Sequence, residues 1–380
     1  MELLHSGIDT LYLACQGALP IETLDLLQGA LAEAREEKCA AIRIIGPGKV
    51  KVYVQPHGFR GGYAFELRQG PADPVIRIKN NPSRVEWNLF VDMGAACCLT
   101  TPACLLVERA RQALNELGVY VTALHVNRID VAFDIETESF ELCAQNFVTP
   151  ARMKVRAMKP EQKTEIVGIE TATVCGGNYQ SVTAGKMPGR QLIVYDKLRE
   201  IADTGKPILK KVWGREDVNN PTPVWRVELR AGRDALSKLV TVKTTDAVFA
   251  ALPDYLSTTL RDIRYLSDSR SNENVTRAAV HPLWRLVQRS TALVLEARTA
   301  PLVPEYVRRQ LRERRLQMSI DQTVGNAVSV NVLQGNNEEL SVSHLTTTFE
   351  GMVQSMVNER GEDHLPEKQR RTKKRLASLL

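Results

Sequence analysis

The sequence has no run of about 18 apolar residues, so it predicts no membrane-spanning helix. Its first residues carry early acids and no basic segment followed by an apolar one, a pattern unlike that of a secretory signal. The seven cysteines are odd in number and form no C-x-x-C pair, which argues against structural zinc and favours reduced thiols. Histidine is also scarce, with six residues and no H-x-H pair. We therefore expect a cytoplasmic protein with no membrane partner.

The composition is that of a globular chain, and 380 residues leave room for two domains or for one large domain with an appendage. The formal net charge of +6 is a modest excess that many proteins without a polyanionic partner also reach. Phosphate binding needs clustered cations, and the clusters lie in residues 308–315 and residues 368–375. The second cluster either adds non-specific affinity for nucleic acid or belongs to a solvated, disordered tail.

Apolar residues recur at three- and four-residue steps in residues 21–38, which predicts an amphipathic helix. A second helical pattern in residues 103–117 leads into a long β pattern in residues 120–135. Strand–helix–strand–strand units on both sides of about residue 140 suggest two similar halves of one sheet. The predicted fold class is α+β, with a central antiparallel sheet flanked by helices and a helical, basic C-terminal appendage.

Residues 185–200 read GKMPGRQLIVYDKLRE and place a tyrosine at the end of a short apolar strand. A glycine-rich, basic lead-in with Lys186 and Arg190 precedes the strand. Tyr195 is followed closely by Lys197 and, one helical turn later, by Glu200. A tyrosine in such a position usually fills a half-buried slot. Charged residues on two other strands favour a functional role here.

These two strands carry charges at alternate positions, and side chains two apart on a strand share a face. Residues 128–134 (RIDVAFD) and residues 225–230 (WRVELR) each present one charged face. Beside the tyrosine strand, they would gather acids and bases on one side of a sheet: Arg128, Asp130, Asp134, Arg226, Glu228 and Arg230. The alternative is a sheet surface in solvent with cross-strand ion pairs.

Carboxylates without nearby histidines favour a hard divalent ion such as Mg²⁺ or Mn²⁺, bound through oxygen. Such an ion would polarise a phosphate ester that Tyr195 attacks. A phenol with a pKa of about 10 is almost entirely protonated at pH 7. We expect a nearby cation such as Lys197 to raise the phenolate fraction.

Taken together, these segments resemble the replication initiation factor family of the Rep_trans type, found in rolling-circle plasmids, filamentous phages and integrative elements. The matching motifs are R-I-D-V-A-F-D at residues 128–134, Y-D-K at residues 195–197 with Glu200, and W-R-V-E-L-R at residues 225–230. They follow the family's order and about its spacing, within residues 60–260. The resemblance implies an endonuclease and strand transferase that nicks one DNA strand at an origin through a 5′-phosphotyrosine intermediate. It also implies that the sheet is the palm of the nicking domain.

The resemblance further implies roles for single residues. Tyr195 is the nucleophile. Lys197 and Arg128 are catalytic candidates from the charged segments themselves rather than from the resemblance. The candidate metal ligands, in order of expectation, are Asp130, Glu200, Asp134 and Glu228. Many family members have an aromatic-glycine-serine-arginine run before Y-D-K, and its absence here leaves open how the lead-in contacts DNA.

Three regions follow from these interpretations: a catalytic, DNA-binding domain in residues 1–265, a helical extension in residues 266–300, and a basic, polar, partly disordered region in residues 301–380. The expected partner is origin DNA with a hairpin or single-stranded nick site, and a helicase or a second copy of the chain could join it. The cations expected to contact DNA are Lys186, Arg190, Arg226, Arg230, Arg308, Arg309 and Arg312.

Two other functions are compatible with the sequence. A relaxase that starts conjugative transfer would use the same chemistry. A protein of a different class would bind an origin without nicking it, and its charged face would only hold phosphates. The sequence identifies neither the origin nor the helix that reads its bases.

Overall fold

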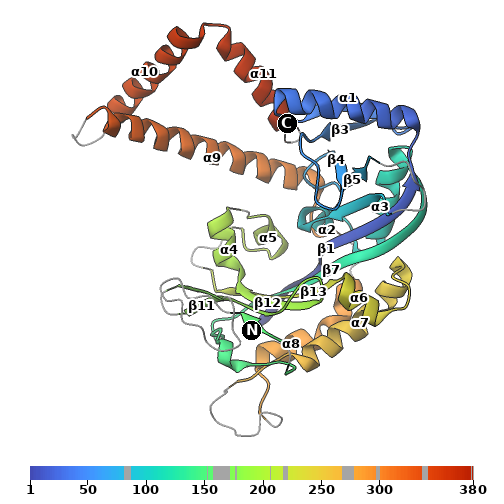
Figure 1. Cartoon of the computed structure of the whole chain (residues 1–380). Coiled ribbons are helices and arrows are strands. Elements are labelled where there is room, and N and C mark those ends of the chain that lie inside the picture. Colours follow the sequence, from blue (N-terminus) through green and yellow to red (C-terminus); the bar gives the residue numbers. More distant parts are fainter. Residues whose placement is uncertain are drawn as a thin grey trace.

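The computed structural model is an α+β structure, with its strands gathered in one large sheet and helices around it (Figure 1). The described residues are 1–80, 87–151, 153–156, 172–175, 178–205, 207–216, 221–267, 278–296, 300–335, 341–377 and 379. The strands are β1 (Glu2–Ala18), β2 (Ala41–Ile45), β3 (Val50–Val54), β4 (Tyr63–Arg68), β5 (Val75–Lys79), β6 (Leu89–Met93), β7 (Tyr120–Glu136), β8 (Phe147–Val148), β9 (Val155–Arg156), β10 (Ala172–Cys175), β11 (Asn178–Gly185), β12 (Arg190–Asp196), β13 (Val224–Gly232) and β14 (Arg264–Tyr265).

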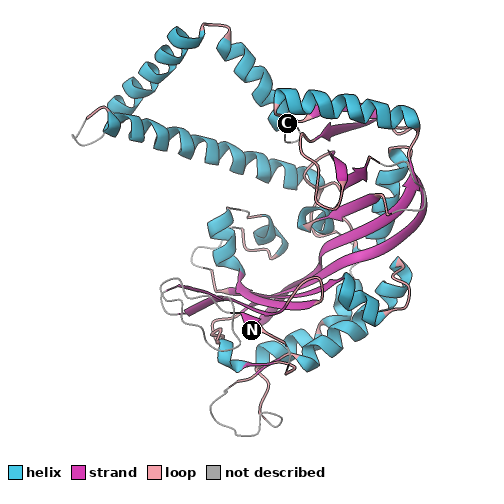
Figure 2. Cartoon of the chain, viewed as in Figure 1, coloured by secondary structure: helices cyan, strands magenta, loops and turns pink. Residues whose placement is uncertain are grey.

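Helices lie on both sides of the sheet (Figure 2). The α-helices are α1 (Ile21–Glu37), α2 (Ala95–Thr100), α3 (Leu106–Glu116), α4 (Lys197–Thr204), α5 (Ile208–Val212), α6 (Arg233–Leu239), α7 (Thr245–Asp262), α8 (Pro282–Arg289), α9 (Pro304–Leu333), α10 (Val342–Arg360) and α11 (His364–Leu376). Short 3₁₀ helices are η1 (Ala103–Leu105), η2 (Ala144–Asn146) and η3 (Thr291–Leu295). Within the described residues, no helix combines the length and the apolar character that a membrane span requires.

The described strands of the large sheet run in the order β10-β11-β12-β13-β7-β1-β6-β5-β4-β3-β2, and β9 pairs with β11 outside this path. The central pair, β1 and β7, divides the sheet into two halves. In each half, the strand that pairs with β1 or β7 is the last strand of that half in sequence order. This strand is β6 in the first half and β13 in the second, and a helix follows each, α2 or α6. The predicted α+β class with a central antiparallel sheet is confirmed, and its two halves share this order of strands.

Strand β1, the centre of the sheet, was not predicted. Its apolar residues Leu11, Leu13 and Cys15 alternate and are fully buried, as expected for a strand against a core. The alternation is interrupted between Ile8 and Thr10, where the pairing with β7 shifts register. A bulge of this kind hides the period-two pattern, and it also re-aims the side chain beside it.

One main hydrophobic core joins the sheet to α1, α3, α6, α7 and α8. Helix α8, in the region predicted as a separate extension, belongs to this core, because Trp284 is fully buried and its indole nitrogen donates to the carbonyls of Leu260 (3.1 Å) and Ile263 (3.0 Å). A smaller cluster on the other side packs Leu209 and Trp213 of the α5 region against Val307 of α9. This second cluster places the start of α9 beside the charged strands.

The described residues of 301–380 form three helices that extend from the body and return to it (Figure 1). Residues 301–380 contain few large apolar side chains, a composition that predicts partial disorder. The helical C-terminal appendage of the predicted fold class is present in the structure. At its far end, Lys374 contacts Glu37 (2.5 Å) and Glu33 (3.5 Å) of α1, and the hydroxyl of Tyr53 donates to the carbonyl of Ala377 (2.9 Å).

Candidate active site

The three charged segments predicted from the sequence meet on one face of the sheet. Arg226 of β13 lies directly between Asp134 of β7 and Tyr195 of β12 in the strand register. Because opposite residues on neighbouring strands point the same way, all three side chains share a face. Tyr195 is the next-to-last residue of β12, and the carboxylate of Asp196 then accepts from the backbone N–H of Arg199 (3.0 Å) and caps α4. The cap starts the helix that carries Lys197 and Glu200.

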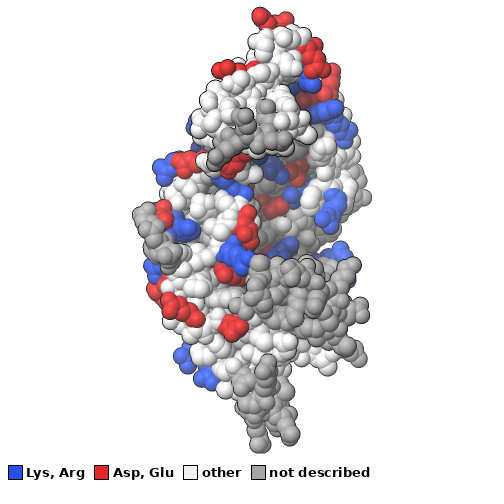
Figure 3. All heavy atoms as spheres, turned by 90° about the vertical axis from the view of Figure 1, so that its left-hand side faces the viewer, with Lys and Arg blue, Asp and Glu red and all other residues white. Residues whose placement is uncertain are grey.

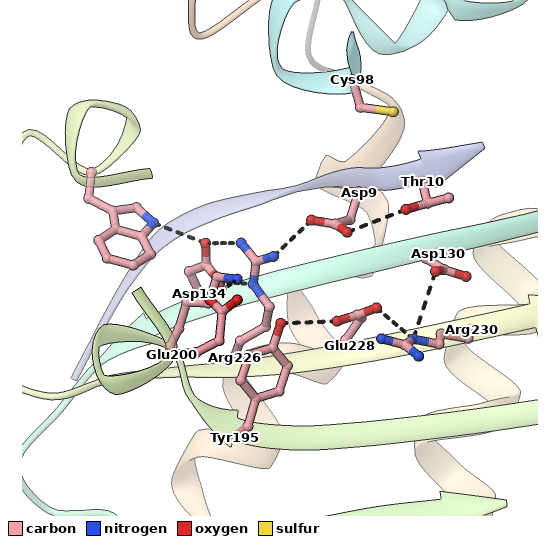
Figure 4. Close-up of polar contacts among 12 residues, drawn as sticks. Asp9, Thr10, Cys98, Asp130, Asp134, Tyr195, Glu200, Arg226, Glu228 and Arg230 are labelled. Carbon is pink, nitrogen blue, oxygen red and sulfur yellow. Dashed lines mark hydrogen bonds and ion pairs between the residues drawn. The ribbon is translucent and has the colours of Figure 1, made fainter. Parts of the chain in front are cut away.

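Arg226 is the best-buried cation of this face, with 2% of the residue exposed. Its guanidinium donates to both carboxylate oxygens of Asp134 (2.6 and 2.8 Å) and to Asp9 of β1 (2.8 Å) (Figure 4). The indole nitrogen of Trp213 also donates to Asp134 (2.9 Å). Burial alone would raise the pKa of Asp134, but the charge and hydrogen bonds of Arg226 outweigh it and hold that pKa below its ordinary value. Asp134 is therefore an ionised partner of Arg226.

Tyr195 is half-buried, and its hydroxyl donates to the Glu228 carboxylate at 3.1 Å. Burial raises the pKa of the Tyr195 hydroxyl, and the nearby Glu228 charge adds to this effect while Arg226 opposes it. The pKa of Tyr195 therefore shifts in the direction opposite to the one expected from a nearby Lys197. The ammonium of Lys197 lies 5.4 Å from the centre of the tyrosine ring and pairs with Glu200 at 2.6 Å. The hydroxyl is protonated at neutral pH, with a carboxylate as its acceptor.

Asp130 forms a second ionic group beside the tyrosine. Arg128 donates to it at 2.5 Å, and Arg230 lies 3.7 Å from it while contacting Glu228 at 2.6 Å. Asp130 is almost fully buried, and burial is the main reason that its pKa is raised to about 6; the Arg128 hydrogen bond opposes the rise. Arg230 thus links Asp130 to Glu228, which accepts the hydrogen bond of the Tyr195 hydroxyl.

These side chains line a cavity of about 520 Å³ on the side of the sheet that α2, α5 and α9 cover. Viewed from the left of Figure 1, charged side chains of both signs gather in the hollowed middle of the surface (Figure 3). The predicted residues at the cavity are Arg128, Asp130, Tyr195, Lys197, Glu200, Arg226, Glu228 and Arg230. Asp134 lies beneath Arg226 and is fully buried. The cross-strand ion pairs of the alternative interpretation are present, between Arg226 and Asp134 and between Arg230 and Asp130, but the central acids are buried and do not form a surface in solvent.

The predicted metal ligands do not form a ready metal site. Within the described residues, no group of three or more His, Cys, Asp or Glu side chains could hold a metal ion. Asp130, Asp134, Glu200 and Glu228 each face a cation instead. Carboxylate oxygens suit Mg²⁺ and Mn²⁺, but these acids are spread over separate ion pairs. In this arrangement they do not fit the ion.

The other cations expected to contact DNA lie elsewhere. Arg190 is five residues from Tyr195 on the same strand, so it points to the opposite face of the sheet, where it pairs with Asp262 of α7 (2.8 Å). With Lys186 it lines a separate cavity of about 750 Å³. The remaining three are exposed on α9: Arg308, Arg309 and Arg312. None of these five lines the cavity around Tyr195.

Sequence reasoning missed Asp9 and Trp213. Asp9 lies at the β1 bulge. It contacts Arg226 of β13 although β7 lies between the two strands. The alternation at Leu11, Leu13 and Cys15 was a signal for β1, although it did not single out Asp9. Trp213 follows α5, and only the packing of that helix over the sheet brings it to Asp134.

Neither a family model nor a curated protein matches the chain. Among solved structures, a rolling circle replication initiator protein from Geobacillus stearothermophilus is similar, with a TM-score of 0.42 and 13% sequence identity. The match covers 77% of this chain and 98% of that chain. A likeness at this level is too distant to assign a function.

Proposed function

We propose that the chain nicks one DNA strand and transfers it through a covalent bond to Tyr195, and that it initiates rolling-circle replication in this way. The observation that carries the proposal is the Tyr195 hydroxyl, which donates to Glu228 at 3.1 Å in a cavity lined by acids and cations. The cations are Arg68, Arg128, Lys197, Arg226 and Arg230. The motif resemblance to replication initiation factors supports the rolling-circle setting.

Attack by Tyr195 requires a proton acceptor, because burial raises the pKa of the hydroxyl and keeps it protonated. The acceptor is Glu228. As the bond between the tyrosine oxygen and phosphorus forms, the hydroxyl proton passes to the Glu228 carboxylate. The bond between phosphorus and the 3′ oxygen breaks, which leaves the 5′ phosphate on Tyr195.

The departing 3′ oxygen needs a proton, and Lys197 supplies it. Burial lowers the pKa of the Lys197 ammonium, and the charge of Arg226 lowers it further, although the Glu200 hydrogen bond opposes both. A lower pKa makes the ammonium a better acid. Rejoining runs the same steps in reverse: a 3′ hydroxyl attacks the phosphotyrosine, Lys197 takes its proton and Glu228 returns one to Tyr195.

The cations stabilise the charge that builds on the phosphoryl oxygens. Arg226 is held by Asp134 and Asp9, and Arg230 by Glu228, so their N–H groups are fixed before substrate arrives. Donors fixed in this way lose little energy to reorganisation during the reaction. The ion pairs of the sheet thus set the geometry of the phosphate site.

A requirement for Mg²⁺ or Mn²⁺ stays a prediction from the acids of the sequence. Because each of these acids faces a cation, an ion would have to displace at least one of those cations from its carboxylate. Reactions with and without EDTA measure the requirement directly. The proton transfers between Tyr195, Glu228 and Lys197 are derived from the protein's own groups.

Covalent capture tests the proposal without knowledge of the origin. The protein is incubated with a random-sequence pool of single-stranded DNA and Mg²⁺, the mixture is denatured, and protein-linked strands are sequenced. We expect strands joined through their 5′ ends around a common motif, with none from Tyr195→Phe. Tyr12→Phe, on β1 of the same sheet, is the matched control and should yield the same strands as wild type.

Two results would contradict the proposal. A wild-type protein that captures no strand while binding the pool would fit an origin-binding protein without nicking activity. Capture by Tyr195→Phe equal to that of wild type would place the nucleophile elsewhere.

A further inference from the structure

A second cavity adjoins the one around Tyr195. It measures about 500 Å³ and shares Arg68, Gly70, Pro71 and Leu311 with the first. Its remaining lining comes mostly from α9, the helix that starts beside the charged strands and leads away from them (Figure 1). A linear ligand that leaves the first cavity past Leu311 therefore enters the second cavity.

One face of α9 builds this second cavity. Val307 is fully buried in the smaller core cluster, Leu311 lines both cavities, and Arg314 and Met318 line the second. These residues recur at steps of three and four, so they share one side of the helix. The buried first turn fixes the helix, and the following turns carry Arg314 and its neighbour Arg315 over the cavity.

Among the described residues that line the second cavity, three are arginines and none is acidic. Arg68 is paired with Glu66 at 2.8 Å. Within the part of the chain that the structure describes, Arg314 and Arg315 form no ion pair, and the Nε atom of Arg314 is buried without a hydrogen-bond partner. A buried N–H group of this kind costs free energy until it finds an acceptor. Arg314 and Arg315 therefore line this cavity with no carboxylate partner among the described residues.

The end of α4 packs against Arg314. Gly205, which ends that helix in a left-handed conformation (φ 60°), packs so closely that a Cβ atom there would lie 3.0 Å from Nε of Arg314. Helix α4 begins immediately after the strand that carries Tyr195. The guanidinium of Arg314 is thus connected to the candidate nucleophile through one short helix.

We propose that the second cavity binds the DNA strand next to the scissile phosphate, with Arg314 and Arg315 on consecutive backbone phosphates. This inference rests on the proposed function, because it supplies the path of the strand that Tyr195 cleaves. Guanidinium groups match the acceptor geometry of phosphate. The apolar side chains of Leu311 and Met318 offer a surface for sugars and bases, a combination that suits single-stranded rather than duplex DNA.

The test measures binding without cleavage. In a Tyr195→Phe background, Arg314→Ala with Arg315→Ala is compared with Arg285→Ala plus Arg289→Ala, a pair of arginines on α8 that removes the same charge. The probe is a fluorescent 20-nucleotide oligothymidylate, followed by anisotropy over a series of salt concentrations. We expect the α9 pair to weaken binding about tenfold and to reduce the salt slope by about 0.7 for each phosphate that the variant no longer neutralises. The α8 pair should change the affinity less than twofold.

A single-residue variant and a duplex probe complete the binding experiment. Arg315→Glu alone, at an exposed position, should weaken binding more than Arg289→Glu, so a folding defect of the double variant cannot hide the result. A blunt duplex of the same length should lose much less affinity than the single strand. Equal losses from the α9 and α8 pairs, or equal losses for duplex and single strand, would overturn the proposal. If wild type captures no DNA covalently while the α9 pair still weakens binding selectively, the nuclease proposal fails, and the second cavity is kept only as a binding site for single-stranded DNA.

Discussion

Replacing Arg226 with methionine tests the ionic core of the site. The variant keeps much of the aliphatic volume but removes the guanidinium that contacts Asp134 twice and Asp9 once. Asp134 has no exposed surface, and among the described residues its carboxylate would keep the Trp213 N–H as a hydrogen-bond donor. Breaking a buried ion pair from one side costs about 3–5 kcal/mol, and we expect the free energy of unfolding to fall by that amount at pH 7.

The loss should depend on pH. In the wild type the pKa of Asp134 lies below its unfolded value of about 3.9, so its stabilisation is present above that value and is lost as pH falls through the folded pKa. In the variant, burial without Arg226 raises that pKa above the unfolded value. The penalty is then largest at neutral pH and shrinks toward about pH 4, as Asp134 becomes protonated.

Urea unfolding followed by circular dichroism at pH 4 to 8 measures both effects. Arg190→Met is the matched control, because Arg190 pairs with a half-exposed Asp262 and should cost about 0.2–1 kcal/mol. A loss for Arg226→Met no larger than that of the control would refute the reasoning. A large loss that stays constant from pH 4 to 8 would show that packing, rather than the charge of Asp134, decides the stability.

Three further predictions concern neighbouring residues. Glu228→Gln removes the proton acceptor of Tyr195, so the rate of strand cleavage should fall about 10²- to 10⁴-fold while oligothymidylate binding is kept; unchanged cleavage would exclude Glu228 as the base. The folded pKa of Asp130, about 6, lies above its unfolded value of about 4, so wild type should lose stability as pH rises between these values, and Asp130→Asn should show no such loss in urea unfolding. Trp213→Phe removes one hydrogen bond to the Asp134 carboxylate and should cost about 1.5–3 kcal/mol of unfolding free energy, whereas no cost would mean that the bond contributes nothing.

The charged face of the site was predictable from the sequence because its strands are regular. Between residues 128–134 and 226–230 the register runs without interruption, so counting by two places Asp134, Arg226 and Glu228 correctly. Tyr195 is the next-to-last residue of a strand of the same kind, directly opposite Arg226. Alternation on a strand is a local property, and local properties can be read from the sequence.

Other features depend on contacts between distant segments. Asp9 reaches Arg226 only because β1 pairs with β7 through a bulge, and no local pattern announces that pairing. The burial of the charged face, which raises the pKa of Tyr195, comes from α5 and from two elements far away in the chain, α2 and α9. Residues 308–315 were identified as a basic cluster, but its orientation follows from Val307, whose burial turns Arg314 toward the cavity.

Mass spectrometry of the trapped complex tests the central claim most directly. Trypsin cleaves after Arg190 and after Lys197, so Tyr195 lies in the peptide QLIVYDK (residues 191–197). After capture of single-stranded DNA and nuclease digestion, the account predicts that this peptide carries a nucleotide joined through its 5′ phosphate to the tyrosine. A nucleotide on any other peptide, or cleaved DNA with this peptide unmodified, would contradict it.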